Sequence, residues 1–128
     1  MELSVLGVVG AGAMGAGIAQ MGLAAGLRVV LYDVNVAARD KARDEILARI
    51  TRLVEKRTLP EGSVAACDAR LVLADALEEL ATAQLVIEAI IERLDAKQAL
   101  FKSLEAVVSP QAVLYIQSKQ SGRKEGRW

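Results

Sequence analysis

The sequence predicts an α/β fold in which helices cover both faces of a parallel sheet. Short runs of Val, Leu and Ile alternate along the 128 residues with longer segments whose apolar residues recur every three or four positions. Strands joined through helices pair in parallel, with right-handed crossovers. Hydrophobic residues make up 53% of the chain and the mean hydropathy is +0.30, so there is enough apolar material for a packed core.

The chain opens with a predicted strand and helix. Val and Leu dominate Leu3–Val9, which is typical of a buried strand. The helix follows at Ala13–Ala25 and stops at Gly26, a typical residue for a helix C-terminus. Gly17, inside this helix, is expected to allow close packing on the sheet. The apolar stripe of the helix is predicted to consist of Met14, Ile18, Met21 and Ala25.

The second predicted pair is the strand Leu27–Asp33 and a long helix at Val36–Lys56. Asn35 is placed to cap that helix, because its side chain can accept a hydrogen bond from a first-turn N–H group. The inner stripe of the helix is predicted to be Ala42, Ile46, Ile50, Leu53 and Val54. The segment Leu59–Ala66 contains Pro60 and Gly62 and is predicted to be a connection with room for one helical turn.

The second half continues the alternation up to a fifth strand. Its predicted elements are a strand at Arg70–Ala74, a short helix at Asp75–Leu80 capped by Asp75, a strand at Gln84–Ala89, a helix at Leu94–Val108 with Leu100, Leu104 and Val107 on its apolar side, and a strand at Ala112–Ile116. Residues 1–116 are therefore expected to form one domain. Residues 117–128 are polar and lack apolar periodicity, which predicts a disordered or non-native tail.

Composition argues against several classes of function. The 16 basic and 16 acidic residues give a net charge of 0, and aromatic residues are only 3%, so neither a nucleic acid nor a membrane surface is an expected partner. No apolar run approaches the roughly 18 residues of a membrane span. Cys67 is the only cysteine and the start of the chain does not resemble a signal peptide, so a cytoplasmic location is expected. The absence of histidine excludes His-based acid–base chemistry and His metal ligands within these residues.

A glycine motif follows the first predicted strand and opens the first helix. Gly10, Gly12 and Gly15 form G-x-G-x-x-G, a motif that is weak alone but informative between a strand and a helix. The first glycine permits a tight turn, the second lets a pyrophosphate approach the backbone, and the third lets the helix pack closely on the strand. The N–H groups near Ala13 and Met14 would then face the phosphates at the positive end of the helix dipole.

Asp33 ends the second predicted strand, 23 positions after Gly10 and close to the expected spacing of about 20. A carboxylate there can accept hydrogen bonds from the adenosine ribose and would repel a 2′-phosphate, and no arginine stands at 34 or 35. The pattern therefore favours NAD over NADP. Alternatives are a turn or helix-capping aspartate, a glycine-rich turn without a ligand, and FAD, whose proteins usually contain more chain around the flavin.

Two segments resemble a known family. The stretch "GVVGAGAMGAGIAQMGLAAGLRVVLYDVN" is similar to the opening of NAD-dependent 3-hydroxyacyl-CoA dehydrogenases, and "QLVIEAIIERLDAKQALFKSLEAVV" is similar to the family's fourth strand and the helix after it. The resemblance extends from about Leu3 to Leu114. It implies a Rossmann-type, doubly wound sheet, stopped here after about its fifth strand, with NAD as cofactor and an acyl-CoA as substrate.

The resemblance also implies roles for residues outside the glycine motif. Glu92 and Lys97 match positions that line the nicotinamide side of the NAD site, although both would otherwise be interpreted as a solvated pair at a helix start. Lys56 matches a lysine that contacts the CoA phosphates, while Arg49 matches another CoA position poorly. The substrate-contacting serine is not assigned, because the motif around Ser118 departs from the family pattern.

The family's catalytic histidine, its partner glutamate and its helical C-terminal domain have no counterpart in these residues. The sequence thus predicts a chain that binds NAD(H) with little or no turnover. Two other functions stay open. One is a non-catalytic Rossmann module that assembles through exposed apolar surface, including as a homo-oligomer. The other is the NAD domain of a different hydroxy-acid dehydrogenase, against which the second segment argues.

Overall fold

The computed structural model describes residues 3–89 and 94–116, with the backbone alone at 94–97 and 115–116. The strands are β1 (Val5–Val9), β2 (Arg28–Tyr32), β3 (Leu71–Ala74), β4 (Leu85–Glu88) and β5 (Val113–Ile116). The helices are α1 (Ala13–Ala24), α2 (Val36–Glu55), α3 (Ser63–Arg70), the 3₁₀ helix η1 (Leu77–Thr82) and α4 (Leu94–Val107). Glu92 and the tail predicted at 117–128 lie outside the described residues.

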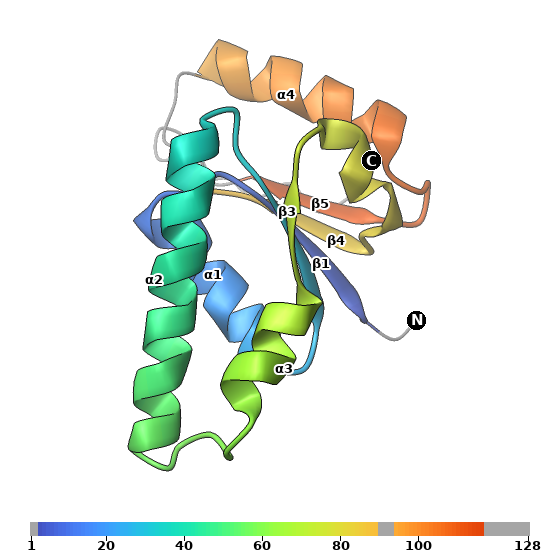
Figure 1. The fold of residues 1–128 in the computed structure, drawn as a ribbon. Helices are drawn as coiled ribbons and strands as arrows, with labels where there is room; N and C mark the ends of the chain where they lie inside the picture. Colours follow the sequence, from blue (N-terminus) through green and yellow to red (C-terminus); the bar gives the residue numbers. More distant parts are fainter. Residues whose placement is uncertain (1–2, 90–93, 117–128) are drawn as a thin grey trace.

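The five strands form one parallel sheet in the order β3-β2-β1-β4-β5 (Figure 1). The chain builds outward from β1 to β3 and then returns to the other side of β1 with β4. This is the strand order of a Rossmann-type, doubly wound sheet, and it confirms the predicted fold class. The reversal places the switch point between the carboxyl ends of β1 and β4, which is where such sheets bind their ligands.

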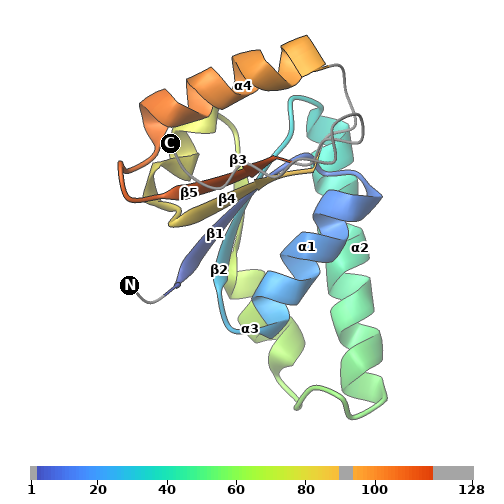
Figure 2. The same cartoon turned by 180° about the vertical axis from the view of Figure 1, so that it is seen from behind.

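Helices cover both faces of the sheet, as Figures 1 and 2 show from opposite sides. On one face, α1, α2 and α3 pack against β1 and β2, and this core contains Leu6, Val8, Val29, Leu31, Ile46, Ile50 and Cys67. On the other face, α4 and η1 pack against the alternate strand residues, and this core contains Val9, Val30, Leu80, Val86, Phe101, Leu104 and Leu114. Leu104 is buried as predicted, but Phe101 was missing from the predicted stripe of α4.

α1 packs on the sheet through its small residues. Its buried residues are Gly15, Ala16, Ala19, Gly22 and Leu23. The predicted stripe was wrong at three of its four positions, because Met14 and Met21 are 39% and 71% exposed and Ala25 is exposed as well, whereas Ile18 packs against the core. Small side chains let a helix axis approach the sheet closely, and hydrophobic periodicity does not weigh residue size.

The prediction for Gly17 was also wrong. A Cβ atom built on Gly17 would meet no atom within 4 Å, so this glycine does not serve helix–sheet packing. Gly22 has that role instead, since its Cβ would lie 2.8 Å from Leu6 Cδ2 and 3.1 Å from Val29 Cγ2.

Two connections differ from the prediction. The segment after α2 contains a complete helix, α3, whose buried Cys67 packs against α1. Arg70, at the end of α3, donates a 2.7 Å hydrogen bond to the Leu23 carbonyl near the end of α1. The predicted cap of the short helix was also wrong: η1 begins after Ala76, and Asp75 receives a hydrogen bond from Arg39 instead.

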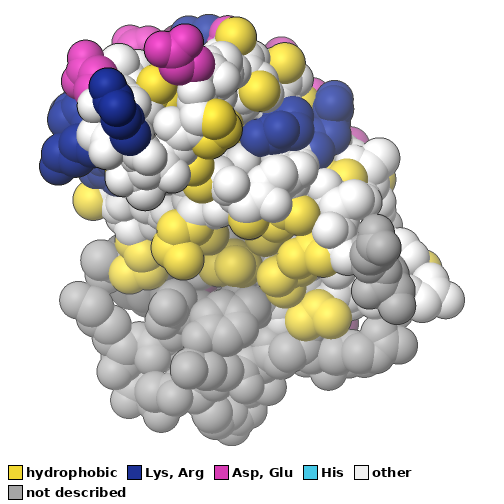
Figure 3. Space-filling view, turned by 90° about the horizontal axis from the view of Figure 1, so that it is seen from below, with side chains coloured by type: hydrophobic (Ala, Val, Ile, Leu, Met, Phe, Trp, Pro, Cys, Tyr) yellow, Lys and Arg dark blue, Asp and Glu magenta, His cyan; other side chains and the backbone are white. Residues whose placement is uncertain are grey.

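The surface carries both charged and apolar regions. Figure 3 shows hydrophobic side chains gathered in a band across one face, with the charged side chains mainly along one edge of it. The large hydrophobic residues that are exposed in the described part are Leu3, Met14, Met21, Val34 and Val36. No helix within 3–89 or 94–116 has the length and hydropathy that crossing a lipid bilayer requires.

Candidate nucleotide-binding site

The turn after β1 depends on glycine for its backbone conformation. Gly10 has φ = +110°, in a region that residues with a side chain rarely adopt. Its N–H donates a 2.8 Å hydrogen bond to the Tyr32 carbonyl at the end of β2. The turn is therefore held against the neighbouring strand, and it directs the chain straight into α1.

Gly15 is required for packing rather than for backbone conformation. A Cβ atom at this position would lie 1.7 Å from the Gly10 carbonyl oxygen and 2.8 Å from the Gly10 carbonyl carbon. Neither atom can move without rebuilding the turn. The third glycine of the motif thus lets the first turn of α1 pack directly on the glycine turn, as the motif predicts.

Gly12 differs from the other two glycines because the protein itself does not require it. It precedes α1 with φ = −73° and ψ = −168°, which any residue can adopt, and a Cβ there would meet nothing within 4 Å. α1 has no side-chain cap and no acidic residue in its first turn. The first N–H groups of an α-helix lack partners within the helix. The N–H groups at Ala13 and Met14 therefore lie at an uncapped, electropositive helix end.

Asp33 joins the glycine turn to the turn after β2. Its Oδ2 accepts a 2.7 Å hydrogen bond from the Ala11 N–H, and its Oδ1 accepts a 2.8 Å bond from the Asn35 N–H. Asp33 therefore does act as a turn aspartate, which the sequence offered as an alternative to the favoured ribose contact. Each carboxylate oxygen can accept a second hydrogen bond, so these contacts leave capacity for a ribose hydroxyl.

Two exposed valines come shortly after Asp33 and were not predicted as site residues. Val34 is 83% exposed and Val36 is 54% exposed. Both are apolar, whereas residues at the start of a helix are normally polar. An apolar surface beside a carboxylate suits a ligand with a flat ring next to a hydroxylated sugar. A signal was present in the sequence, because two of the three residues after an aspartate that ends a predicted strand are β-branched valines.

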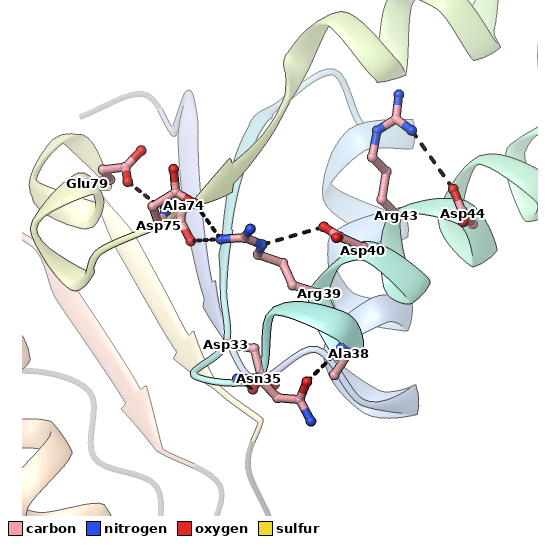
Figure 4. Close-up of polar contacts among 10 residues, drawn as sticks. All are labelled: Asp33, Asn35, Ala38, Arg39, Asp40, Arg43, Asp44, Ala74, Asp75 and Glu79. Carbon is pink, nitrogen blue, oxygen red and sulfur yellow. Dashed lines mark hydrogen bonds and ion pairs between the residues drawn. The ribbon is translucent and has the colours of Figure 1, made fainter.

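A buried arginine lies at the same edge of the sheet and was also missed. Arg39, in the first turn of α2, is only 7% exposed. Its Nη1 donates to the Ala74 carbonyl at 2.5 Å and to Asp75 Oδ1 at 3.0 Å. Figure 4 shows this side chain directed at the end of β3, with Asp33 and Asn35 on the neighbouring turn. The predicted inner stripe of this helix contains only apolar residues, so the sequence pattern gave no reason to single out Arg39.

The structure brings the glycine motif and Asp33 together but not every other predicted residue. Lys56 directly follows α2, whose 20 residues extend about 30 Å away from the edge that carries Asp33 (Figure 1). The Lys97 side chain and Glu92 lie outside the described residues. Glu88 is buried at the carboxyl end of β4, in register with Val9.

Comparison by sequence indicates one family. Residues 5–121 match the sequence profile described as 3-hydroxyacyl-CoA dehydrogenase, NAD binding domain. The chain is 39% identical over 114 residues to 3-hydroxyadipyl-CoA dehydrogenase of Escherichia coli, covering 89% of this chain and 24% of that protein. It is 38% identical over 114 residues to a probable 3-hydroxybutyryl-CoA dehydrogenase of Bacillus subtilis, covering 89% of this chain and 40% of that one.

Solved structures of 3-hydroxybutyryl-CoA dehydrogenases superpose closely on the chain. The crystal structure of 3-hydroxybutyryl-CoA dehydrogenase from E. coli superposes with a TM-score of 0.86 at 37% identity, covering 92% of this chain and 25% of that one. The crystal structure of (S)-3-hydroxybutyryl-CoA dehydrogenase from Ralstonia eutropha gives 0.84 at 32% identity, covering 91% and 41%. The chain therefore spans about a quarter to two fifths of the length of these relatives.

Proposed function

Because this chain belongs to the family of NAD-binding domains of 3-hydroxyacyl-CoA dehydrogenases, we propose that it is the cofactor-holding part of an enzyme that oxidises a 3-hydroxyacyl-CoA to the 3-oxoacyl-CoA. The wider role would be fatty-acid or related acyl-CoA degradation. One observation carries the proposal. Gly12 leaves the start of α1 open although the fold would tolerate a side chain there, and Asp33 lies beside that opening.

The described residues fit NAD at its adenosine and pyrophosphate end. Gly10, Gly12 and Gly15 form the turn, and the N–H groups near Ala13 and Met14 would bind the pyrophosphate at the positive end of α1. Bound NAD supplies a hydride acceptor for the hydroxyl-bearing carbon of the substrate.

Asp33 would accept hydrogen bonds from the adenosine ribose. Its carboxylate disfavours a 2′-phosphate, which supports NAD rather than NADP. On the resemblance alone, Glu92 and Lys97 would line the nicotinamide side.

The acyl-CoA part of the proposal rests on the resemblance and on Lys56. This lysine is exposed at the end of α2, far enough from Asp33 that the CoA phosphates and NAD would occupy separate regions. The 128 residues contain no histidine, while the family's base is a histidine. We therefore predict little or no turnover by this chain alone. Oxidation of 3-hydroxybutyryl-CoA, followed by NADH absorbance, checks this: a rate comparable with that of a full-length enzyme would contradict it.

NAD titration of the purified chain, by calorimetry, tests the cofactor assignment through Gly12→Val. The backbone at this position suits a residue with a side chain, and a Cβ atom there meets no atom within 4 Å, so the chain should still fold, at a cost of about 1 kcal/mol for valine at a helix N-cap. The added side chain should nevertheless abolish NAD binding, because it fills the approach to the open helix start. Gly17→Ala is the matched control, since it also adds a side chain to open space but lies farther along α1; it should bind like wild type.

Asp33→Ala tests the ribose contact. Losing hydrogen bonds to a charged acceptor should weaken NAD binding about 10- to 100-fold. Unfolding must be measured in parallel, because Asp33 also joins two turns. Normal NAD binding by both Gly12→Val and Asp33→Ala would overturn the cofactor assignment.

A non-catalytic assembly module is the second candidate function. The observation in its favour is exposed apolar surface, including Met21 at 71% and the band of hydrophobic side chains in Figure 3. Sedimentation velocity with and without NAD separates the two functions. Self-association without NAD binding would favour assembly, whereas saturable NAD binding would favour the cofactor domain.

A further inference from the structure

The Arg39 guanidinium is buried at the carboxyl edge of the sheet although burial is costly for a charge. Its side chain is 9% exposed, and its Nε has no hydrogen-bond partner among the described residues. The two carboxylates near it are largely in solvent: Asp75, at 3.0 Å from Nη1, is 85% exposed, and Asp40, at 3.8 Å from Nε, is 62% exposed. Such pairs are weak compared with the desolvation of a buried guanidinium.

Fold stability therefore gives little reason for an arginine at this position. Replacing a buried ion pair with an apolar side chain of similar volume is often neutral or stabilising. What an apolar side chain could not do is donate to the Ala74 carbonyl, the last one in β3. The specific contribution of Arg39 is thus a connection between the first turn of α2 and the end of β3.

The turn after β3 is held from its other side as well. Glu79 Oε2 accepts hydrogen bonds of 2.7 Å from the Asp75 N–H and 3.1 Å from the Ala76 N–H. In the sheet, Ala74 is in register with Tyr32, the residue before Asp33. The turns at Asp33 and at Asp75 therefore lie next to each other at one edge (Figure 4).

The adenine of a bound dinucleotide would lie at this edge of the sheet. In the proposed site, the pyrophosphate lies over the turn between β1 and α1, and the ribose lies at Asp33 beyond β2. A ligand extended in that direction reaches the turn after β3 next, because β3 follows β2 in the sheet.

We infer that Arg39 is a positioning residue that holds the turn after β3 in place as the floor of the adenosine pocket. This inference rests on the proposed NAD site. Arg39 acts through the Ala74 carbonyl and Asp75, and its own guanidinium is too deeply buried to contact the cofactor.

Arg39→Met tests the inference, with Arg43→Met as the matched control. Methionine retains much of the apolar volume and removes the donors. Arg43 lies one turn further along α2 and pairs with Asp68 of α3 at 2.8 Å. Arg43→Met therefore makes the same substitution in the same helix but removes no contact with β3. The measurements are the Kd values of the full 128-residue chain for NAD, AMP and nicotinamide mononucleotide.

For Arg39→Met we expect Kd to rise about tenfold for both NAD and AMP, because a loosened turn must be ordered on binding. Binding of nicotinamide mononucleotide should not change, since that half of the cofactor does not reach β3. Arg39→Lys should recover part of the AMP affinity, because an ammonium can still donate to the Ala74 carbonyl. Arg43→Met should bind all three ligands like wild type.

Glu79→Gln keeps the test decisive if Arg39→Met fails to fold. This change replaces the carboxylate that accepts hydrogen bonds from the same turn with a weaker, uncharged acceptor. Kd for AMP should then rise about threefold. Unchanged AMP binding in the folded variants, or an equal loss for AMP and nicotinamide mononucleotide, would overturn the role of Arg39 and leave the NAD site standing. Failure of the wild-type chain to bind NAD at all would overturn both.

Discussion

The first two helices of the chain follow neighbouring strands but begin and pack in opposite ways. α2 starts at Asn35, whose side chain accepts a 3.1 Å hydrogen bond from the Ala38 N–H, and it buries Ile46 and Ile50. α1 starts at Gly12 without a side-chain cap, and it buries mainly glycine and alanine. α2 is thus built in the usual manner of a stable amphipathic helix, whereas α1 departs from it at both its start and its packing face.

The difference indicates what each helix start is for. Asn35 satisfies an N–H group of α2 within the protein, so that helix end has less to offer a ligand. The start of α1 is left open, and glycines bring the helix close to the turn that precedes it. A helix end without a cap is less stable by itself, and it is suited to an anion that takes the place of the cap.

The largest effect should separate two glycines of α1. Gly15→Ala should destabilise the fold by about 3 kcal/mol, because the new methyl group would meet the backbone of Gly10 at 1.7 Å. Gly17→Ala should stabilise it by about 0.5–1 kcal/mol, since the methyl group enters open space and alanine favours helix. Urea unfolding followed by circular dichroism measures both. Similar free energies of unfolding for the two variants would contradict the packing of α1.

A medium effect is expected at the start of α2. Asn35→Ala should lower the free energy of unfolding by about 1 kcal/mol, because the Ala38 N–H loses its acceptor. Asn35→Ser retains a capping oxygen and should restore most of the loss. Thermal unfolding of the three proteins checks this order. If alanine were as stable as asparagine, the cap would contribute nothing, and the contrast with α1 would disappear.

The smallest effect should come from the end of α2. The chain leaves α1 through Gly26, at φ = +94°, but it leaves α2 through Arg57, at φ = +61°. The Arg57 and Thr58 N–H groups donate to the Val54 and Leu53 carbonyls, as in a glycine-terminated helix. Arg57→Gly should therefore stabilise the fold by roughly 0.5 kcal/mol.

Gly26→Ala is the converse change at the end of α1, and it should destabilise by about 1 kcal/mol. Chemical denaturation of both variants would detect the opposite signs. A loss of stability in Arg57→Gly would mean that the arginine side chain has a role that the described contacts do not include.

Turn chemistry and strand composition were reliable guides wherever the cause is local. Asn35 was expected to cap α2 and does so, and Gly10 was expected to form a tight turn and has a positive φ. The strands were predicted to within a few residues, because short runs of Val and Leu bounded by glycine or polar residues rarely form anything other than a strand.

The errors arose where packing between distant segments decides. Met14 and Met21 have helical spacing but face solvent, because the buried face of α1 consists mainly of glycine and alanine, with Leu23 as its one large fully buried side chain. α3 was underestimated, since its helix depends on the burial of Cys67 against α1. Arg39 resembles any surface arginine until the end of β3 is placed beside it.

The local pattern alone specifies an alternating α/β chain, a glycine turn and an aspartate 23 positions after its first glycine, because backbone conformation and short-range hydrogen bonding depend on neighbouring residues. The tertiary structure was needed to assign separate reasons to the glycines: conformation at Gly10, contact at Gly15 and an open approach at Gly12. It was also needed to show that Asp33 and Arg39 hold adjacent turns. Both results depend on which strands are neighbours, and that order is determined by how the whole chain packs around one sheet.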